Sequence, residues 1–189
     1  MRKEPQTEKA KMLAGELYLA SDAELTAARK RAKALCAAYN RNVVDLDLGI
    51  LAELFGYPTD AHLEPPFYCD YGYNIRLGRS VYANHNLVVL DCAPVTLGDH
   101  AYIGPNTVLS TAGHPLDPTV RTSGLEYAKP ITIGDNVWIG ASVSVLPGVE
   151  IGANTTIGAG SVVTRSIPPD CVAVGNPCRV LRVLGSERG

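Results

Sequence analysis

The sequence of 189 residues contains no long apolar run and no large excess of charge of either sign. No stretch approaches the roughly 18–20 consecutive apolar residues that cross a bilayer, and no apolar segment follows the charged N-terminus as it would in a signal peptide. Seventeen Lys and Arg residues stand against 19 Asp and Glu residues, for a formal net charge of −2. We therefore expect neither a membrane nor a nucleic acid as a partner.

Cysteine is scarce, and the motifs of several cofactor sites are missing. The five cysteines are an odd number without a C-x-x-C pair, which argues against a disulfide framework and a structural zinc site and favours a cytoplasmic protein. The four histidines are far apart and form no H-x-x-x-x-H pair, which disfavours a zinc-dependent lyase. The motifs G-x-x-x-x-G-K-[ST], G-x-G-x-x-G and G-x-S-x-G do not occur. The sequence predicts no bound metal.

Residues 1–59 have the apolar spacing of helices, with intervals near 3.6 residues. Thr7 is a candidate N-cap of a first helix, and Ser21 or Asp22 of a second. A third short helix is predicted over 43–55. The apolar positions of the three segments are Leu13 and Leu17; Leu25, Ala28, Ala32, Leu35 and Tyr39; and Val43, Leu46, Ile50 and Leu54.

Beyond residue 60 a repeat of six residues replaces the helical period. From Ile133 the chain reads IGDNVW, IGASVS, VLPGVE, IGANTT, IGAGSV and VTRSIP, with Ile or Val leading each hexad. A hexad fits a short flat strand followed by a sharp bend, where Gly, Asn and Asp tolerate positive φ. Three hexads make one triangular coil of a parallel β-helix with the leading aliphatic side chain inside, so residues 133–168 predict two uninterrupted coils. Chance Gly and Ile spacing in a β-sandwich is the alternative, which six consecutive hexads disfavour.

The repeat is interrupted twice, and a solenoid has no chemistry without such interruptions. Leu77 and Leu97 both start hexads, but their separation exceeds a coil of three hexads by two positions, which predicts a small insertion at 91–94. A larger excursion loop over 110–130 contains no hexad. Loops that project from a rigid scaffold commonly carry functional side chains. The predicted organisation is a helical segment over 1–59 and a β-helix over 60–184.

The excursion loop contains His114 and Glu126. Gly113 and Pro115 restrict the backbone of His114, which makes this histidine the candidate general base. Imidazole has a reference pKa near 6.5, so its neutral form is abundant at neutral pH. Glu126 is the candidate carboxylate that holds the second ring nitrogen, although a backbone carbonyl could do the same. The alternatives are a surface histidine and a solvated loop charge.

Upstream, the segment PPFYCDYGYNIRLG places Tyr68, Tyr71 and Tyr73 around Asp70. Aromatic faces beside a carboxylate suit a sugar, whose C–H faces stack on rings and whose hydroxyls donate hydrogen bonds. A cap of tyrosines that seals the first coil is the alternative, and the two interpretations are compatible.

Three arginines gather near the C-terminus: Arg165, Arg179 and Arg182. Because no phosphate-binding loop motif is present, basic side chains of this kind would have to hold a phosphate-bearing ligand. A solvated basic edge is the alternative.

Several segments together resemble the maltose and galactoside O-acetyltransferases, a branch of the hexapeptide-repeat acyltransferases. The matching segments are EKAKMLAGELY, EPPFYCDYGYNIRLG, YANHN, STAGHPLD, KPITIGDNVWIG, IGAGSVVTRSIPPD and VGNPCRV, which span nearly the whole chain. The N-terminal block is more similar to the maltose branch. The resemblance implies a mainly β fold, a left-handed parallel β-helix that is an exception to the usual right-handed crossover. It also implies a homotrimer with active sites between subunits, acetyl-CoA as the donor and a sugar hydroxyl as the acceptor.

The resemblance also assigns roles to residues. It implies that His114 is the catalytic histidine and that Asp70, Tyr82 and Asn84 bind the acceptor. The positions that would contact CoA are Ala141, Ala159, Thr164, Arg165, Arg179 and Arg182. We expect direct acetyl transfer in a ternary complex, with no cysteine as nucleophile.

The chain departs from the galactoside branch at acceptor positions. Cys92 stands where that branch has an acceptor-binding Asp, no acid aligns at Ala20, and Asp70 stands in place of a Ser. These differences argue against galactoside specificity and for a sugar such as maltose or glucose. Two further hypotheses are the same fold acting on another hydroxyl, such as that of a lipochitin oligosaccharide, serine or an antibiotic, and a non-catalytic trimeric scaffold.

Overall fold

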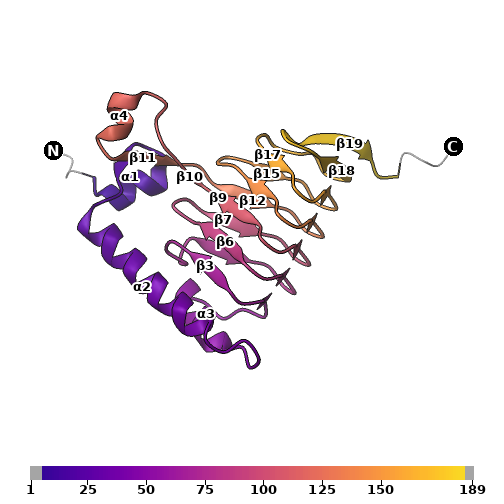
Figure 1. The fold of residues 1–189 in the computed structure, drawn as a ribbon, viewed down its shortest axis with the longest axis horizontal. Coiled ribbons are helices and arrows are strands. Elements are labelled where there is room, and N and C mark those ends of the chain that lie inside the picture. The colour runs from indigo at the N-terminus through magenta and orange to yellow at the C-terminus, as the bar shows by residue number, and fades with distance from the viewer. Residues whose placement is uncertain (1–5, 186–189) are drawn as a thin grey trace, which may run out of the picture.

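Three N-terminal helices precede a parallel β-solenoid in the computed structural model, which describes residues 6–185 (Figure 1). The first five residues of the predicted helical segment lie outside the described range. Helix α1 (Glu8–Ala14) begins after Thr7, whose hydroxyl accepts a hydrogen bond from the Ala10 backbone N–H. Helix α2 (Ala23–Tyr39) begins after Asp22, whose carboxylate accepts from two backbone N–H groups of the first turn. Both caps agree with the sequence prediction, with Asp22 rather than Ser21 at the second helix.

The third helix is shorter than predicted. Helix α3 (Leu48–Phe55) starts after Asp47, which caps it, instead of at residue 43. In the preceding loop the Asn42 side chain accepts hydrogen bonds from the N–H groups of Val44 and Asp45, which offers the backbone an alternative to a helical turn. Val43 is 64% exposed and does not belong to the apolar stripe. Among residues 6–185, no helix has the length and apolarity needed to cross a membrane.

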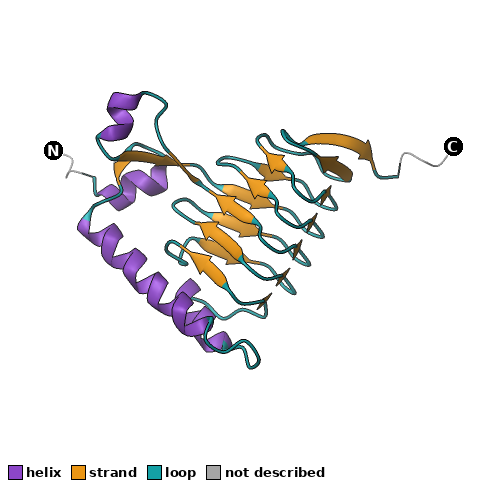
Figure 2. Cartoon of the chain, viewed as in Figure 1, coloured by secondary structure: helices purple, strands orange, loops and turns teal. Residues whose placement is uncertain are grey.

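The solenoid has three faces of short parallel strands (Figure 2). The first face contains β2 (His62–Leu63), β5 (Tyr82–Ala83), β8 (Tyr102–Ile103), β13 (Trp138–Ile139), β16 (Thr156–Ile157) and β18 (Cys171–Val174). The second face contains β3 (Phe67–Cys69), β6 (Leu87–Leu90), β9 (Val108–Ser110), β14 (Ser144–Val145) and β17 (Val162–Val163). The third face contains β4 (Ile75–Leu77), β7 (Val95–Leu97), β12 (Ile131–Ile133) and β15 (Glu150–Ile151). These faces form a β-solenoid of about six turns, which confirms the predicted fold class.

The end of the solenoid differs from its body. Strand β19 (Arg179–Val183) reverses direction and pairs antiparallel with β18 on the first face. A turn over 175–178 makes the reversal, with a cis peptide bond before Pro177. The six-residue repeat therefore stops before the last strand of the predicted β-helix.

The hexads place their apolar side chains inside as expected. The leading residues of the six hexads are at most 1% exposed: Ile133, Ile139, Val145, Ile151, Ile157 and Val163. A fully buried side chain of this kind contributes about 1.5–3 kcal/mol of transfer free energy relative to an exposed one. Helices α2 and α3 add Tyr39, Leu54 and Phe55 to the same core at the first coil. The helices thus close the N-terminal end of the solenoid, as terminal caps of repeat proteins do.

Glycine has two different roles in the hexad, of which only the one in the bend was predicted from the sequence. Positive φ occurs at the fourth position, as in Asn136 (φ 56°) and Gly160 (φ 71°). The second position of the hexad has glycine for another reason, namely the close approach of successive coils. A Cβ atom on Gly134 would lie 2.7 Å from the backbone nitrogen of Ala153 in the next coil. The second-position glycines are therefore required by stacking and not by the bend.

Candidate active site

The three irregularities of the solenoid fall at one corner, between its second and third faces. The first two coils are each longer than three hexads, since His62 pairs with Tyr82 and Tyr82 with Tyr102. Their extra residues lie at 70–74 and 91–94, and the excursion leaves the third coil at the same corner. The insertion at 91–94 was predicted, whereas the matching one in the first coil was missed. The chain therefore departs from regular stacking where three neighbouring coils can build one site.

The excursion is more ordered than the predicted loop. It contains β10 (Ala112–Gly113), α4 (Pro118–Thr122) and β11 (Leu125–Ala128). Strand β11 pairs antiparallel with β10 on one side and with β1 (Tyr18–Leu19) of the N-terminal segment on the other. Figure 1 shows this small sheet beside α1, away from the axis of the solenoid. The hexad pattern does not predict these strands, because their partners lie outside the repeat.

A cavity of about 370 Å³ opens at this corner. Three predicted residues line it together: His114, Glu126 and Asp70. The other lining residues are Ala20, Arg29, Lys33, Leu90, Cys92 and Ala112. Arg29 and Lys33 belong to α2 and were not predicted, because nothing in the helical period indicates which exposed face covers a cavity. The helical segment thus contributes to the candidate site as well as closing the solenoid.

His114 and Glu126 face each other inside this cavity. The His114 Nε2 atom lies 4.0 Å from the Glu126 Oε1 atom, and the imidazole is 59% exposed. This distance is longer than a hydrogen bond, so a movement of about 1 Å would make one. The other carboxylate oxygen, Oε2, accepts a hydrogen bond of 3.0 Å from the Tyr18 hydroxyl. The hydrogen bond from Tyr18 therefore fixes the Oε2 atom of Glu126, while the Oε1 atom faces His114.

Asp70 is positioned by a second carboxylate, that of Asp91, which was not predicted as a site residue. Asp91 has no exposed surface, and its Oδ1 atom accepts hydrogen bonds from the backbone N–H groups of Asp70 and Tyr71 at 3.0 and 2.8 Å. Burial raises the pKa of Asp91 to about 6. Burial also raises the pKa of Asp70, against the opposing effect of the nearby Arg29. The only sequence signal for Asp91 was the 91–94 insertion that begins with it.

Cys92 lies beside Asp70 in the lining of the cavity. Its Sγ atom lies 3.7 Å from Asp70 Oδ2, and burial raises the pKa of the thiol to about 12. A thiol of this kind stays protonated near neutral pH and is a poor nucleophile. Among residues 6–185, no group of three or more His, Cys, Asp or Glu side chains is arranged to hold a metal ion.

The structure places the other predicted acceptor residues elsewhere on the chain. Tyr82 and Asn84 line a groove of about 260 Å³ on the first face, together with Ala141, Tyr102 and Trp138. Trp138 and Tyr102 are 58% and 52% exposed and are paired in register on neighbouring strands. No residue lines both this groove and the cavity of His114, Glu126 and Asp70, which we call the His114 cavity. Within one chain the predicted acceptor residues therefore form two separate groups.

The predicted CoA positions extend along the C-terminal coils. Ala141 and Ala159 follow β13 and β16 at the same corner, and the close contact of Gly140 with the Ala159 backbone shows that they stack. Thr164 and Arg165 are exposed just after β17. Arg179 and Arg182 lie on β19. The six positions thus span two corners of the solenoid and its last strand.

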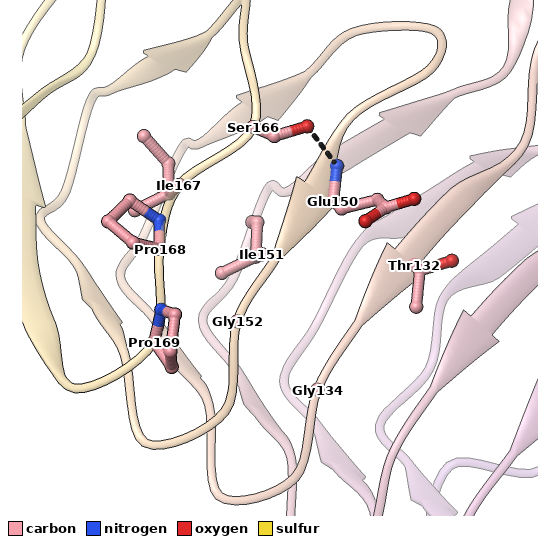
Figure 3. Close-up of a pocket in the computed structure, with 9 residues that line it drawn as sticks. All are labelled: Thr132, Gly134, Glu150, Ile151, Gly152, Ser166, Ile167, Pro168 and Pro169. Carbon is pink, nitrogen blue, oxygen red and sulfur yellow. Dashed lines mark hydrogen bonds between the residues drawn. The ribbon is translucent and has the colours of Figure 1, made fainter.

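A further groove, of about 560 Å³, lies at the end of the third face. Figure 3 shows the residues that line it. Its lining includes Thr132, Glu150 and Ser166, and the Glu150 backbone N–H donates to the Ser166 hydroxyl over 3.0 Å. The only charged side chain in this lining is that of Glu150, and none of the predicted site residues is present. An acidic groove of this kind does not suit a phosphate-bearing ligand.

Comparisons with known proteins agree with this architecture. Residues 11–58 match the maltose acetyltransferase hexapeptide capping motif, and residues 130–165 match the family of bacterial transferase hexapeptides with six repeats. The galactoside O-acetyltransferase of Escherichia coli (strain K12) is 45% identical over 187 residues, which cover 97% of this chain and 91% of that protein.

Two solved structures have the same fold over nearly their whole length. A maltose O-acetyltransferase from Clostridium difficile 630 is 45% identical with a TM-score of 0.92, and the match covers 96% of this chain and 99% of that one. A hexapeptide-repeat acetyltransferase from Vibrio cholerae O1 biovar eltor, complexed with acetyl coenzyme A, is 42% identical with a TM-score of 0.86, covering 94% and 98%. The chain therefore belongs to the maltose and galactoside O-acetyltransferase family and is a hexapeptide-repeat O-acetyltransferase.

Proposed function

We propose that this protein transfers the acetyl group of acetyl-CoA to a hydroxyl of a sugar such as maltose or glucose. The proposal rests on one observation, namely that the His114 imidazole and the carboxylates of Asp70 and Glu126 line the same cavity. A sugar presents many hydroxyls, and carboxylates are strong acceptors for their hydrogen bonds. Family membership supplies the donor, since a relative of the same fold is complexed with acetyl coenzyme A.

His114 acts as the general base in this proposal. One imidazole nitrogen accepts the proton of the sugar hydroxyl while the hydroxyl oxygen attacks the thioester carbonyl. The tetrahedral intermediate then collapses with loss of the CoA thiolate, which takes up the proton from the imidazolium. A backbone N–H of the solenoid wall stabilises the oxyanion. Glu126 faces the imidazole across 4.0 Å and orients it once the two groups close to hydrogen-bond distance.

The acetyl group passes directly from CoA to the sugar in a ternary complex. An acetyl-enzyme on cysteine is disfavoured because Cys92, the one cysteine that lines the cavity, is a neutral buried thiol. CoA is held by backbone groups at Ala141 and Ala159, by Thr164, and by the positive charges of the arginines near the C-terminus. Arg165, Arg179 and Arg182 supply those charges.

The active protein is a homotrimer with a site at each boundary between subunits. In one chain the His114 cavity and the groove of Tyr82 and Asn84 lie apart, yet both are proposed to bind the same acceptor. A neighbouring subunit that packs its first face near the excursion would bring the two groups together. Burial of the exposed Tyr102 and Trp138 side chains favours such packing.

Substitution of His114 tests the proposed function. Thiol release from acetyl-CoA is measured with a panel of maltose, glucose, galactosides and oligosaccharides as acceptors. We expect His114→Ala to lower kcat by about 10²–10⁴-fold with acetyl-CoA binding nearly unchanged, because only the base is removed. Wild-type turnover in this variant contradicts the assignment of His114. Absence of CoA release with every acceptor would favour a non-catalytic scaffold, and activity only on a non-sugar hydroxyl would favour the other acceptor class.

A further inference from the structure

Tyr18 is a buried residue of the N-terminal segment that reaches the candidate site. It has no exposed surface and packs in a small cluster beside the cavity, whose other members are Met12, Leu25, Tyr71, Cys92, Ala93 and Ala128. Of these, Cys92 also lines the cavity. This cluster is distinct from the core of the solenoid. Residues of the helical segment therefore form a second core against the corner that carries the site.

Strand pairing fixes Tyr18 opposite Glu126. Strands β1 and β11 are antiparallel, with Tyr18 directly across from Glu126 and Leu19 across from Leu125. Directly opposite residues of such a pair have Cβ atoms about 4.5–5.5 Å apart on one face, which is close enough for side-chain contact. The register thus brings together two residues that are 108 positions apart in sequence.

The contacts of Glu126 connect Tyr18 to His114. The Tyr18 hydroxyl donates to Oε2 over 3.0 Å, and Oε1 lies 4.0 Å from His114 Nε2. Burial raises the pKa of Tyr18 well above its ordinary range, so the hydroxyl remains protonated and keeps its role as donor. The two carboxylate oxygens therefore have different partners, one buried and fixed, the other half-exposed and facing the reacting group.

We propose that Tyr18 is a positioning residue, which orients the Glu126 carboxylate toward His114 and so makes the N-terminal segment part of the active site. Without the hydroxyl, Glu126 keeps its place on β11 but its carboxylate can rotate away from the imidazole. A base that is oriented by a third group loses efficiency when that group is released. This inference rests on the proposed function, in which His114 is the base.

A double-mutant cycle tests the role of Tyr18. Tyr18→Phe keeps the ring and the apolar packing and removes only the hydroxyl, whereas Glu126→Ala removes its partner. With acetyl-CoA and either glucose or maltose, we expect Tyr18→Phe to lower kcat about tenfold and to leave the KM for acetyl-CoA unchanged. In the Glu126→Ala background the same substitution should change kcat by less than about twofold, because its effect passes through Glu126. A larger change would assign the effect to Cys92, whose thiol also contacts the Tyr18 hydroxyl, and would overturn the proposal.

Tyr39→Phe is the matched control. Tyr39 is 1% exposed and its hydroxyl donates to the Leu63 carbonyl over 2.6 Å, but it lies in the solenoid core away from the cavity. It should lose stability comparable to that lost by Tyr18→Phe and retain wild-type kcat. Equal kcat losses in the two tyrosine variants, or kcat losses that multiply independently in the cycle, would overturn the proposal. A wild-type protein inactive on both sugars would instead contradict the proposed acceptor.

Discussion

Asp91 and Asp70 stand at the same corner of the solenoid, yet only one of them contacts the cavity. Asp91 is enclosed and accepts hydrogen bonds from backbone N–H groups of the 70–74 segment. It thereby holds the turn that places Asp70 in the lining of the cavity. The cost of this arrangement is a buried negative charge, which is why its pKa is raised to about 6.

Asp91 should make the free energy of unfolding depend on pH. Its pKa is about 6 in the folded state and about 3.9 in an unfolded chain, so the folded state binds more protons between these values. Its contribution to stability is therefore full below pH 4 and is lost as the pH rises through 6, with a change of up to about 3 kcal/mol. We expect Asp91→Asn to remove this fall, as measured by urea unfolding at pH 4, 5, 6 and 7.

The matched substitution is Asp99→Asn on the exposed Arg79–Asp99 pair. Hydrogen bonds from the backbone and side chain of Arg79 lower the pKa of Asp99. The contribution of Asp99 to the free energy of unfolding therefore has the opposite sign to that of Asp91 and is lost as the pH falls. Asp99→Asn should therefore leave the decline between pH 4 and 6 in place. If the decline survives in Asp91→Asn as well, Asp91 is not the group that titrates there.

At the scale of the coil, the hexad uses glycine for two separate geometrical needs. Gly134 has ordinary φ, and its missing side chain allows the next coil to stack against it. Gly160 has φ of 71°, and a Cβ atom there would meet nothing within 4 Å. Asn136 and Asn154 adopt the same left-handed conformation at the equivalent hexad position. One glycine position is thus limited by space and the other by backbone conformation.

Two substitutions separate these needs. Gly134→Ala should lower the free energy of unfolding by about 1–3 kcal/mol, because its Cβ would overlap the backbone of Ala153. Gly160→Asn should change it by less than about 0.5 kcal/mol, because asparagine tolerates the left-handed conformation at an open position. Thermal and urea unfolding at one protein concentration measure both. Equal losses in the two variants would contradict coil spacing as the limit at the second hexad position.

At the scale of the whole molecule, the proposed trimer predicts complementation between inactive subunits. In that trimer His114→Ala and Asn84→Ala would each remove one half of a site that two chains share. When the two variants are co-expressed in equal amounts, about a quarter of the subunit boundaries combine an intact His114 with an intact Asn84. We expect mixed trimers to recover about that fraction of wild-type activity, measured by thiol release from acetyl-CoA.

Trimers of either variant alone are the control, since none of their boundaries is complete. Size-exclusion chromatography with light scattering should give three times the mass of one chain. Mixed preparations that stay as inactive as the single variants would place both residues in the same subunit's site. A monomeric but active protein would contradict the shared site altogether.

The candidate site was only partly predictable from the sequence. His114 and Glu126 could be found because they lie where the hexads stop, and Asp70 because aromatic residues surround it. Arg29, Lys33 and Tyr18 could not, because a helical or short extended segment does not specify which face meets a distant loop. In the sequence Asp91 is distinguished only by its place in the insertion. Its hydrogen bonds to the backbone of the first coil are known only from the structure.

Sequence alone determined the solenoid, the helix cap at Thr7 and the family, and it limited the second cap to Ser21 or Asp22, because these depend on local spacing and on short motifs. A period of six residues decides which side chains point inward without reference to the rest of the chain. Only the tertiary structure decided that the irregular segments of three coils meet at one corner and that Tyr18 meets Glu126. Those contacts depend on how coils of unequal length stack and on pairing between strands that are far apart in the sequence, which no local pattern records.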